Sequence, residues 1–267
     1  MNNLERRMVD ILKELKEKHG VISVRAEFEA EGTKMEELLR LKEICMSADL
    51  GLTLKIGGCE SIRDMIEART VGVNYLVAPM VESSYSLRKY LQAISKVFSE
   101  QERRNIEVLC NIETGIAGRN MDEMLQIPEI LLLKGIVIER VDYCFSVGKD
   151  DTNINDEDVN KDIMKIIEKA KNKGLLCTIG GGVSAQSLPF FLRIPEGHLD
   201  RYETRKICFS ADKGLRNNPE KGILKALGFE VLWLRNKMDF YKSIQTKDLD
   251  RMTLLEHRYL KAIDTLI

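Results

Sequence analysis

The chain has 267 residues, of which 44% are hydrophobic and 31% charged, the composition of a globular protein with a sizeable buried core. Its 41 basic and 42 acidic residues leave a net charge of −1, which argues against recognition of nucleic acid or a membrane surface through bulk charge. No apolar run approaches the roughly 18 residues of a membrane span, and the charged amino-terminal segment predicts an amphipathic helix, so we expect a cytoplasmic location.

Short apolar segments rich in β-branched residues alternate along the chain with longer helical patterns. The predicted strands are Val21–Glu29, Leu52–Ile56, Tyr75–Pro79, Ile106–Glu113, Gly135–Val141, Leu175–Ile179 and His198–Glu203. The predicted helices include Lys34–Met46, Ser61–Thr70, Tyr85–Ser99, Met121–Leu125 and Asp158–Lys173. Strands that alternate with helices at this spacing predict an α/β fold, a (β/α)8 TIM barrel over about residues 20–210. Only seven strands are recognisable, so either the eighth is cryptic or the barrel is irregular.

The pattern changes after Ala211. Asn218–Ile244 and Leu249–Ile267 predict extra C-terminal helices, although the segment FEVLWL within the first of them is also compatible with a strand. Residues 1–267 are therefore expected to form a single domain with a helical extension over about residues 211–267. The extension either covers the barrel or packs against a neighbouring subunit.

Six cysteines and three histidines limit the chemistry that the chain offers. No two cysteines form a CxxC pair, and several lie in apolar strand-like runs, which favours buried reduced thiols over a zinc site. The three histidines are far apart in the sequence, so a site with several histidine ligands has almost no candidates.

Charged residues occupy one face of the first predicted strand, VISVRAEFEAEG. Arg25, Glu27 and Glu29 alternate there with apolar side chains, as on a strand with two different faces. The helices of a barrel cover the outer face of its strands, so the apolar face should point outward and the charged face into the lumen. Lys55 in LTLKIGG and Glu113 in IEVLCNIETG repeat this pattern. The three strands predict a polar site at the carboxyl end of the barrel, where such barrels build active sites.

Buried charges must be paired or bind a metal, which leaves two interpretations of this cluster. Its acidic and basic side chains could neutralise one another in a purely structural network. Alternatively, its carboxylate oxygens suit Mg²⁺ or Mn²⁺, which prefer hard ligands and retain several waters.

Two later segments belong to the same rim. CTIGGGVS places Gly181 and Gly182 after a strand, where bare backbone N–H groups could hold an anion or where glycine could simply allow a tight turn. Arg205, in HLDRYETRK, could bind a carboxylate or phosphate through two N–H groups, or could lie on the surface.

Three blocks of the sequence resemble the HpcH/HpaI aldolase and citrate lyase family, whose fold is a pyruvate kinase-like barrel. They are GVNYLVAPMVESS (Gly72–Ser84), CNIETGIAGRNMDEML (Cys110–Leu125) and KGIVIERVDYCFSVG (Lys134–Gly148). The resemblance extends roughly from Val21 to Lys206. The chain departs from the family pattern at three places, which indicates a divergent sub-branch. Ala30 stands where the family has a histidine, Lys55 where it has an arginine, and Glu139 with Arg140 where it has glycine and proline.

The resemblance implies that Glu113 and Asp142 bind a divalent metal, Mg²⁺ or Mn²⁺. Asp150 and Asp151 also lie nearby in the sequence, but Asp142 fits the family block better. The implied enzyme is a metal-dependent carbon–carbon lyase or aldolase that acts on a small 2-oxo acid or a phosphoenolpyruvate-like compound through a metal-stabilised enolate. A homo-oligomer is expected from the family and from the helical extension.

The remaining site residues take roles within this reaction. Lys55 and Arg25 are expected to stabilise the enolate or carboxylate. Because the histidine is missing, Glu27, Glu29 or a metal-bound water is expected to transfer a proton. Gly181, Gly182 and Arg205 are expected to hold an anionic part of the substrate. Two alternatives stay open. One is a Schiff-base aldolase with Lys55 as the amine, and the other is a barrel that binds an anionic metabolite without catalysis.

Overall fold

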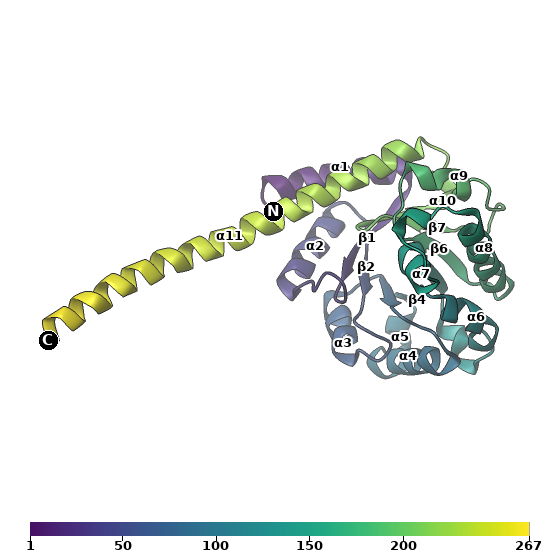
Figure 1. Ribbon diagram of the computed structural model, residues 1–267, viewed down its shortest axis with the longest axis horizontal. Helices are drawn as coiled ribbons and strands as arrows, with labels where there is room; N and C mark the ends of the chain where they lie inside the picture. Colours follow the sequence, from purple (N-terminus) through teal and green to yellow (C-terminus); the bar gives the residue numbers. More distant parts are fainter. Residues whose placement is uncertain (267) are drawn as a thin grey trace.

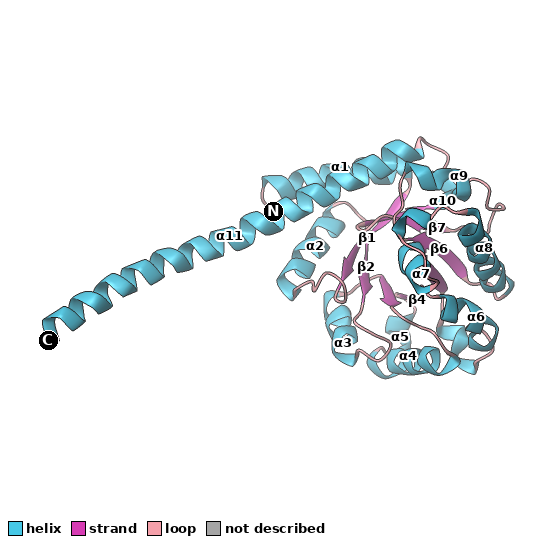
Figure 2. Cartoon of the chain, in the orientation of Figure 1, coloured by secondary structure: helices cyan, strands magenta, loops and turns pink. Residues whose placement is uncertain are grey.

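A closed barrel of eight strands forms the centre of the computed structural model, which describes residues 1–266 (Figures 1 and 2). The strands are β1 (Val21–Glu27), β2 (Gly51–Lys55), β3 (Tyr75–Ala78), β4 (Glu107–Ile112), β5 (Gly135–Glu139), β6 (Leu176–Gly180), β7 (Arg201–Glu203) and β8 (Ile207–Ser210). They follow one another around the barrel in chain order, and β1 to β7 pair in parallel. The predicted α/β barrel is confirmed.

Helices surround the barrel and fill most of the connections between strands. They are α1 (Asn3–His19), α2 (Met35–Ser47), α3 (Ile62–Val71), α4 (Ser84–Val97), α5 (Glu100–Arg103), α6 (Gly115–Met124), α7 (Arg140–Ser146), α8 (Glu157–Asn172), α9 (Leu188–Phe191), α10 (Ala211–Gly214) and α11 (Pro219–Leu266). Three short 3-10 helices are η1 (Pro128–Leu132), η2 (Asp151–Asn153) and η3 (Ala185–Ser187).

The eighth strand is the irregular one. β8 pairs antiparallel with both β7 and β1, so the barrel closes without a final parallel strand. The turn of residues 204–206 joins β7 directly to β8, and the backbone N–H of Thr204 donates to the carbonyl of Ile207 across it. No helix separates these two strands, which is why the alternating strand–helix pattern of the sequence misses β8.

Strand ends differ slightly from those predicted. β1 stops at Glu27, two residues early, because the chain turns back and the N–H of Thr33 donates to the carbonyl of Glu27. Glu29 therefore lies in a loop and not on the strand. β7 begins at Arg201, so His198 lies outside it and is partly exposed.

The barrel interior has a small apolar layer beneath a charged one. Val77, Leu109 and Val137 form a cluster separate from the main core, with Tyr75 packed against it. The main core instead contains the opposite faces of the strands, including Leu52, Leu54 and Ile56, packed against the helices. The alternation of faces predicted from the sequence is thus the one observed.

The C-terminal extension is one continuous helix, α11, where the sequence predicts two. Its first half packs against α1, and the rest projects away from the barrel as an isolated rod (Figure 1). Phe229, Trp233 and Asn236 are buried at helical spacing, so the strand interpretation of FEVLWL is wrong. Among residues 1–266, no helix has the length and apolarity that a membrane span requires.

Candidate active site

Arg25 lies at the centre of a buried ion-pair network at the carboxyl end of the barrel. Its guanidinium nitrogens lie 2.8 Å from a Glu203 oxygen, 3.2 Å from Glu139 and 3.4 Å from Glu27. Glu139 is on β5, four strands from β1 in the closed barrel, so this contact must cross the lumen. The predicted inward direction of Arg25 and Glu27 therefore agrees with the geometry. Arg25 is 3% exposed, and all its close charged partners are carboxylates.

Glu203 is the most deeply buried acid of this network. Burial raises the pKa of its carboxyl to about 7, Glu139 and Glu27 raise it as well, and Arg25 opposes them. Burial alone would lower the pKa of Arg25, but its three carboxylate partners outweigh burial and raise it. The guanidinium therefore remains charged, whereas the Glu203 carboxyl can gain or lose a proton near neutral pH.

Lys55 faces two of the acidic residues predicted with it. Its ammonium lies 2.8 Å from Glu29 and 3.7 Å from Glu27. Burial alone would lower the pKa of Lys55, but Glu27, Glu29 and Glu139 outweigh it and raise the pKa above the ordinary value. Since a Schiff-base lysine must lose its proton to attack a carbonyl, this environment disfavours the imine mechanism.

Glu113 follows β4 and is held in a fixed orientation. One carboxylate oxygen accepts the backbone N–H of Met80 at 2.5 Å, and the other accepts the Asn111 side-chain amide at 2.8 Å. Met80 adopts φ +52°, a left-handed conformation that is strained for a non-glycine residue. Burial raises the pKa of Glu113, against these hydrogen bonds. The Oδ1 atom of Asn111 is buried and has no hydrogen-bond partner in the described part of the chain.

Asp142 lies in the first turn of α7, directly after β5, and is exposed. Burial of part of its carboxyl raises its pKa, and the negative charge of Glu139 raises it further. Lys55 opposes this rise, as it does for Glu113. Glu113 and Asp142 therefore share Lys55 and Glu139 as electrostatic neighbours, and both belong to one acidic rim.

The rim fits a divalent cation through its donor set. Six carboxyl groups at this end of the barrel have Arg25 and Lys55 as ion-pair partners or electrostatic neighbours, and Arg140 and Lys206 add two further buried positive charges beside Glu139 and Glu27. The six are Glu27, Glu29, Glu113, Glu139, Asp142 and Glu203, so acidic groups still outnumber basic ones. No three histidine, cysteine or acidic residues among those the structure describes are arranged to hold a metal by themselves. A site for Mg²⁺ often uses one or two carboxylates and completes its shell with waters and substrate, so two carboxylates are compatible with it.

The glycine-rich loop after β6 is shaped by Arg140. This side chain is fully buried and donates to the carbonyls of Gly180 and Gly181 and to Ser187. Gly181 has φ +72°, and a Cβ there would lie 2.5 Å from the backbone nitrogen of Arg140. Backbone packing therefore requires glycine at this position, in agreement with the tight turn that was one of the two interpretations of CTIGGGVS. Anion binding at Gly181 and Gly182 stays a prediction.

Arg205 is an exposed residue of the β7–β8 turn that binds Glu31. Its side chain is about half exposed and lies 3.2 Å from a Glu31 oxygen. Lys206 is buried beside it and pairs with the same carboxylate. Together they attach the loop after β1 to the turn after β7.

Sequence reasoning named Glu139 and Arg140 only as departures from the family pattern, and it gave neither them nor Glu203 a role in the site. Glu139 and Glu203 end β5 and β7, and each shares a strand face with an inward residue, Val137 or Arg201. That shared face was the available signal for Glu139 and Glu203. The contacts of Arg140 could not be predicted from the sequence, because its partners are backbone carbonyls and side chains distant in the sequence.

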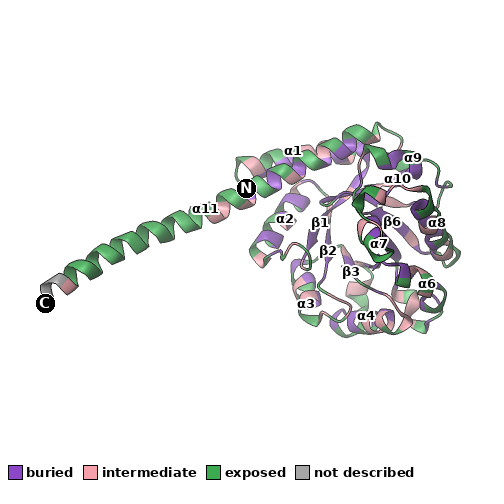
Figure 3. Cartoon of the chain, in the orientation of Figure 1, coloured by how far each residue is buried: buried purple, intermediate pink, exposed green. Residues whose placement is uncertain are grey.

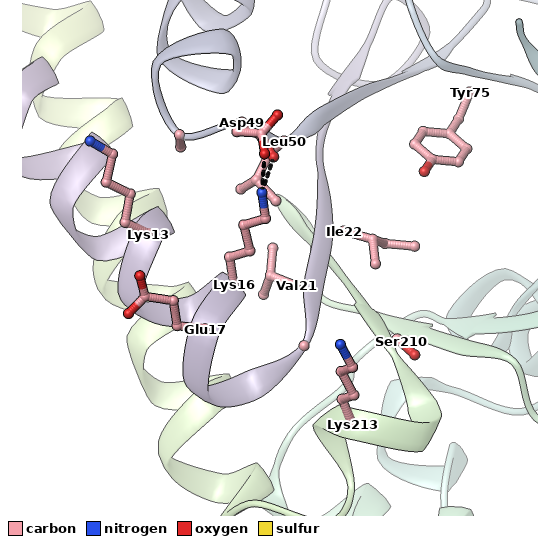
Figure 4. Close-up of a pocket in the computed structure, with 12 residues that line it drawn as sticks. Lys13, Lys16, Glu17, Val21, Ile22, Asp49, Leu50, Tyr75, Ser210 and Lys213 are labelled. Carbon is pink, nitrogen blue, oxygen red and sulfur yellow. Dashed lines mark hydrogen bonds and ion pairs between the residues drawn. The ribbon is translucent and has the colours of Figure 1, made fainter.

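A cavity of about 740 Å³ lies at the opposite end of the barrel (Figure 4). Its walls include Val21 and Leu50, at the amino ends of β1 and β2. Ser210, the last residue of β8, also lies at this end because β8 runs antiparallel to β1. Lys16 in its wall donates to the carbonyl of Asp49 at 2.7 Å. This end of a barrel normally serves stability, so we do not assign the active site to it.

A closed α/β barrel with a charged site at the carboxyl ends of its strands is the architecture of a TIM-barrel enzyme. Residues 52–183, about half of the chain, match the family model HpcH/HpaI aldolase/citrate lyase. The family predicted from the sequence is thereby confirmed, and the predicted enzyme class, a carbon–carbon lyase, is that of the family. No curated protein gives a significant match.

Solved structures with this fold are similar over most of the chain but at low sequence identity. An HpcH/HpaI aldolase/citrate lyase family protein from Burkholderia cenocepacia J2315 has 12% identity and a TM-score of 0.56, over 82% of this chain and 98% of that one. Citrate synthase SbnG has 15% identity and a TM-score of 0.58, over 85% and 98%. Macrophomate synthase has 14% identity and a TM-score of 0.52, over 70% and 79%. These likenesses confirm the fold.

Proposed function

We propose that this protein is a divalent-metal-dependent carbon–carbon lyase that acts on a 2-oxo acid or a phosphoenolpyruvate-like compound. The observation that carries the proposal is the excess of carboxylates at the carboxyl end of the barrel, among them Glu113 and Asp142, to which the resemblance to the family assigns the metal. The names citrate synthase and macrophomate synthase among proteins of the same fold support chemistry at a carbon–carbon bond.

Glu113 and Asp142 are the residues that would hold Mg²⁺ or Mn²⁺. When bound, the ion would supply Lewis-acid stabilisation of the negative charge that develops as the bond breaks. Glu113 is already oriented for this task, because Met80 and Asn111 each hold one of its oxygens. Asp142 is exposed, so it can be reached from the barrel mouth.

Lys55 is the cation best placed to contact the substrate. It stays protonated because of its raised pKa, so it can attract a substrate carboxylate or a developing enolate. Glu29 lies beside it, is partly exposed, and can accept or return a proton at the mouth. Arg25 is too enclosed for direct contact and positions Glu27, Glu139 and Glu203.

The remaining features concern substrate, compartment and assembly. We infer that Gly181, Gly182 and Arg205 bind an anionic part of the substrate, Arg205 by exchanging its contact with Glu31. The described cysteines are all free thiols, which supports a reducing compartment such as the cytoplasm. Small molecules, and neither nucleic acid nor membrane, are the proposed partners, in a homo-oligomer.

The test is cleavage of a panel of 2-oxo acids, with and without Mg²⁺, Mn²⁺ and a chelator. Glu113→Gln should lower metal-dependent turnover by at least about 100-fold, because an amide oxygen replaces a charged ligand at the developing charge. Asp151→Asn is the matched control, since this exposed acid of the same segment has no described contact with the rim. Equal turnover by wild type and Glu113→Gln would remove the metal site from the proposal.

Borohydride trapping with pyruvate separates the metal mechanism from the Schiff-base alternative. We expect no covalent adduct, because the Lys55 amine is held in its charged form. A borohydride-stable adduct that Lys55→Met abolishes would instead establish the imine mechanism.

A further inference from the structure

Residues 242–260 of α11 extend beyond the part of the helix that packs on the barrel. Among residues 219–260, Tyr241 is the last side chain with a described contact to the barrel, through its hydroxyl to Glu37 at 2.7 Å. Beyond it, residues 242–260 are exposed on every side (Figure 3), and their described hydrogen bonds, such as Thr246 to Lys242, stay within the helix. Helices in proteins owe most of their stability to the packing of an apolar face, so this segment lacks its usual source of stability.

An apolar stripe runs along α11 on the side away from the barrel. The barrel side is formed by Ile223, Ala226, Phe229, Trp233 and Asn236, all buried. The stripe consists of apolar side chains that are each 47–71% exposed, and its members are Leu224, Leu227, Val231, Leu234, Met238, Met252, Leu255 and Tyr259.

The spacing of the stripe is that of a coiled coil. Successive members are three and four residues apart, so Leu224, Val231 and Met238 occupy one heptad position and Leu227 and Leu234 the other. Met252 lies two heptads after Met238, and Leu255 lies three heptads after Leu234, so both keep the same register. A straight α-helix drifts about 20° per heptad from such a repeat, so a stripe that keeps the repeat favours a supercoiled pair of helices.

We propose that α11 pairs with α11 of a second copy of this chain as a parallel two-stranded coiled coil. In the parallel register Arg251 of one copy lies beside Glu256 of the other, and Glu230 lies beside Arg235, each twice by symmetry. Lys237 meets Lys242, but Lys237 is already neutralised by Glu37 at 2.9 Å. In an antiparallel pair centred between Met252 and Leu255, Arg251 of one copy would instead face Arg258 of the other, and the two positive charges would repel.

Three positions interrupt the stripe where α11 leaves the barrel. Tyr241, Gln245 and Asp248 take the three core positions between Met238 and Met252, and the Tyr241 hydroxyl donates to Glu37 of α2. Polar core residues in a coiled coil lower its stability and fix its register and partner.

Sedimentation of the full chain tests the proposal. Wild type should contain at least two chains of 30.5 kDa, and Met252→Glu with Leu255→Glu should halve its mass or reduce it further. The substitutions lie beyond the last barrel contact, so the barrel should keep its thermal transition. Leu254→Glu is the matched control, because Leu254 is equally exposed but lies off the stripe, and it should leave the mass unchanged.

Orientation is tested by Tyr259→Cys, which in a parallel pair places two thiols together and should give a disulfide-linked dimer under mild oxidation. Failure to cross-link contradicts the parallel arrangement. A monomeric wild type, or an assembly unaffected by Met252→Glu with Leu255→Glu, overturns the proposal. The same holds if Leu254→Glu dissociates it equally, since the stripe would then not be the contact.

Discussion

Protonation of Glu203 should control part of the stability of the barrel between pH 4 and pH 8. Burial raises the pKa of this carboxyl to about 7, with smaller contributions from Glu139 and Glu27 and an opposing one from Arg25. In the unfolded chain a glutamate titrates at about 4.3. An acid whose pKa is raised by folding stabilises the folded state fully below the unfolded pKa. That stabilisation is lost as the pH rises through the folded pKa.

The magnitude follows from the shift. Each pKa unit corresponds to about 1.4 kcal/mol, so the free energy of unfolding should lose about 3 kcal/mol from this group between pH 4 and pH 8. Glu203→Gln removes the titration and keeps the size of the side chain. The stability of the variant relative to wild type should therefore rise by about 3 kcal/mol from pH 4 to pH 8.

Urea denaturation at pH 4, 6 and 8 measures this difference between the two proteins. Glu203→Asp keeps a carboxyl group and serves as the control, which should retain the pH dependence that Glu203→Gln loses. Parallel stability curves for wild type and Glu203→Gln would show that Glu203 takes up no proton on folding, and would refute the reasoning.

Three further substitutions test the contacts around the site. Arg25→Met should lower the free energy of unfolding at pH 8 by about 3–5 kcal/mol, because three buried carboxylates lose their cation; a loss below about 1 kcal/mol in urea denaturation would contradict the network. Arg140→Met should cost about 3 kcal/mol by leaving the Gly180 and Gly181 carbonyls without donors, and thermal unfolding equal to wild type would show that the loop does not need this side chain. Glu31→Gln removes the negative charge shared by Arg205 and Lys206, so proteolysis within residues 28–34 should accelerate; an unchanged cleavage rate would mean that these ion pairs do not restrain the loop.

The charged lumen could be predicted because alternation along a strand is a local property. Arg25 and Glu27 share one face of β1, and the helices outside require the other face to be apolar. Their partners could not be found in this way. The contact of Arg25 with Glu139 depends on closure of the barrel, which brings together residues 114 positions apart.

The errors at the C-terminal end have a similar cause. β8 is only four residues long and follows a turn instead of a helix, so the strand–helix alternation does not reveal it. Ser243–Asp248 contains polar residues that resemble a loop, yet none of them prevents a helix, and α11 continues through it. Glu29 was placed on the strand because the alternation persists for two residues after the chain has turned.

The central claim is that Glu113 and Asp142 bind a catalytic divalent cation. The most direct measurement is a crystal structure of the protein soaked with Mn²⁺ and oxalate, a mimic of the pyruvate enolate, with anomalous scattering to locate the ion. The account predicts one manganese peak in contact with carboxylate oxygens of Glu113 and Asp142 and with the oxalate. Oxalate bound at Lys55 without manganese, or manganese bound away from both carboxylates, would contradict it.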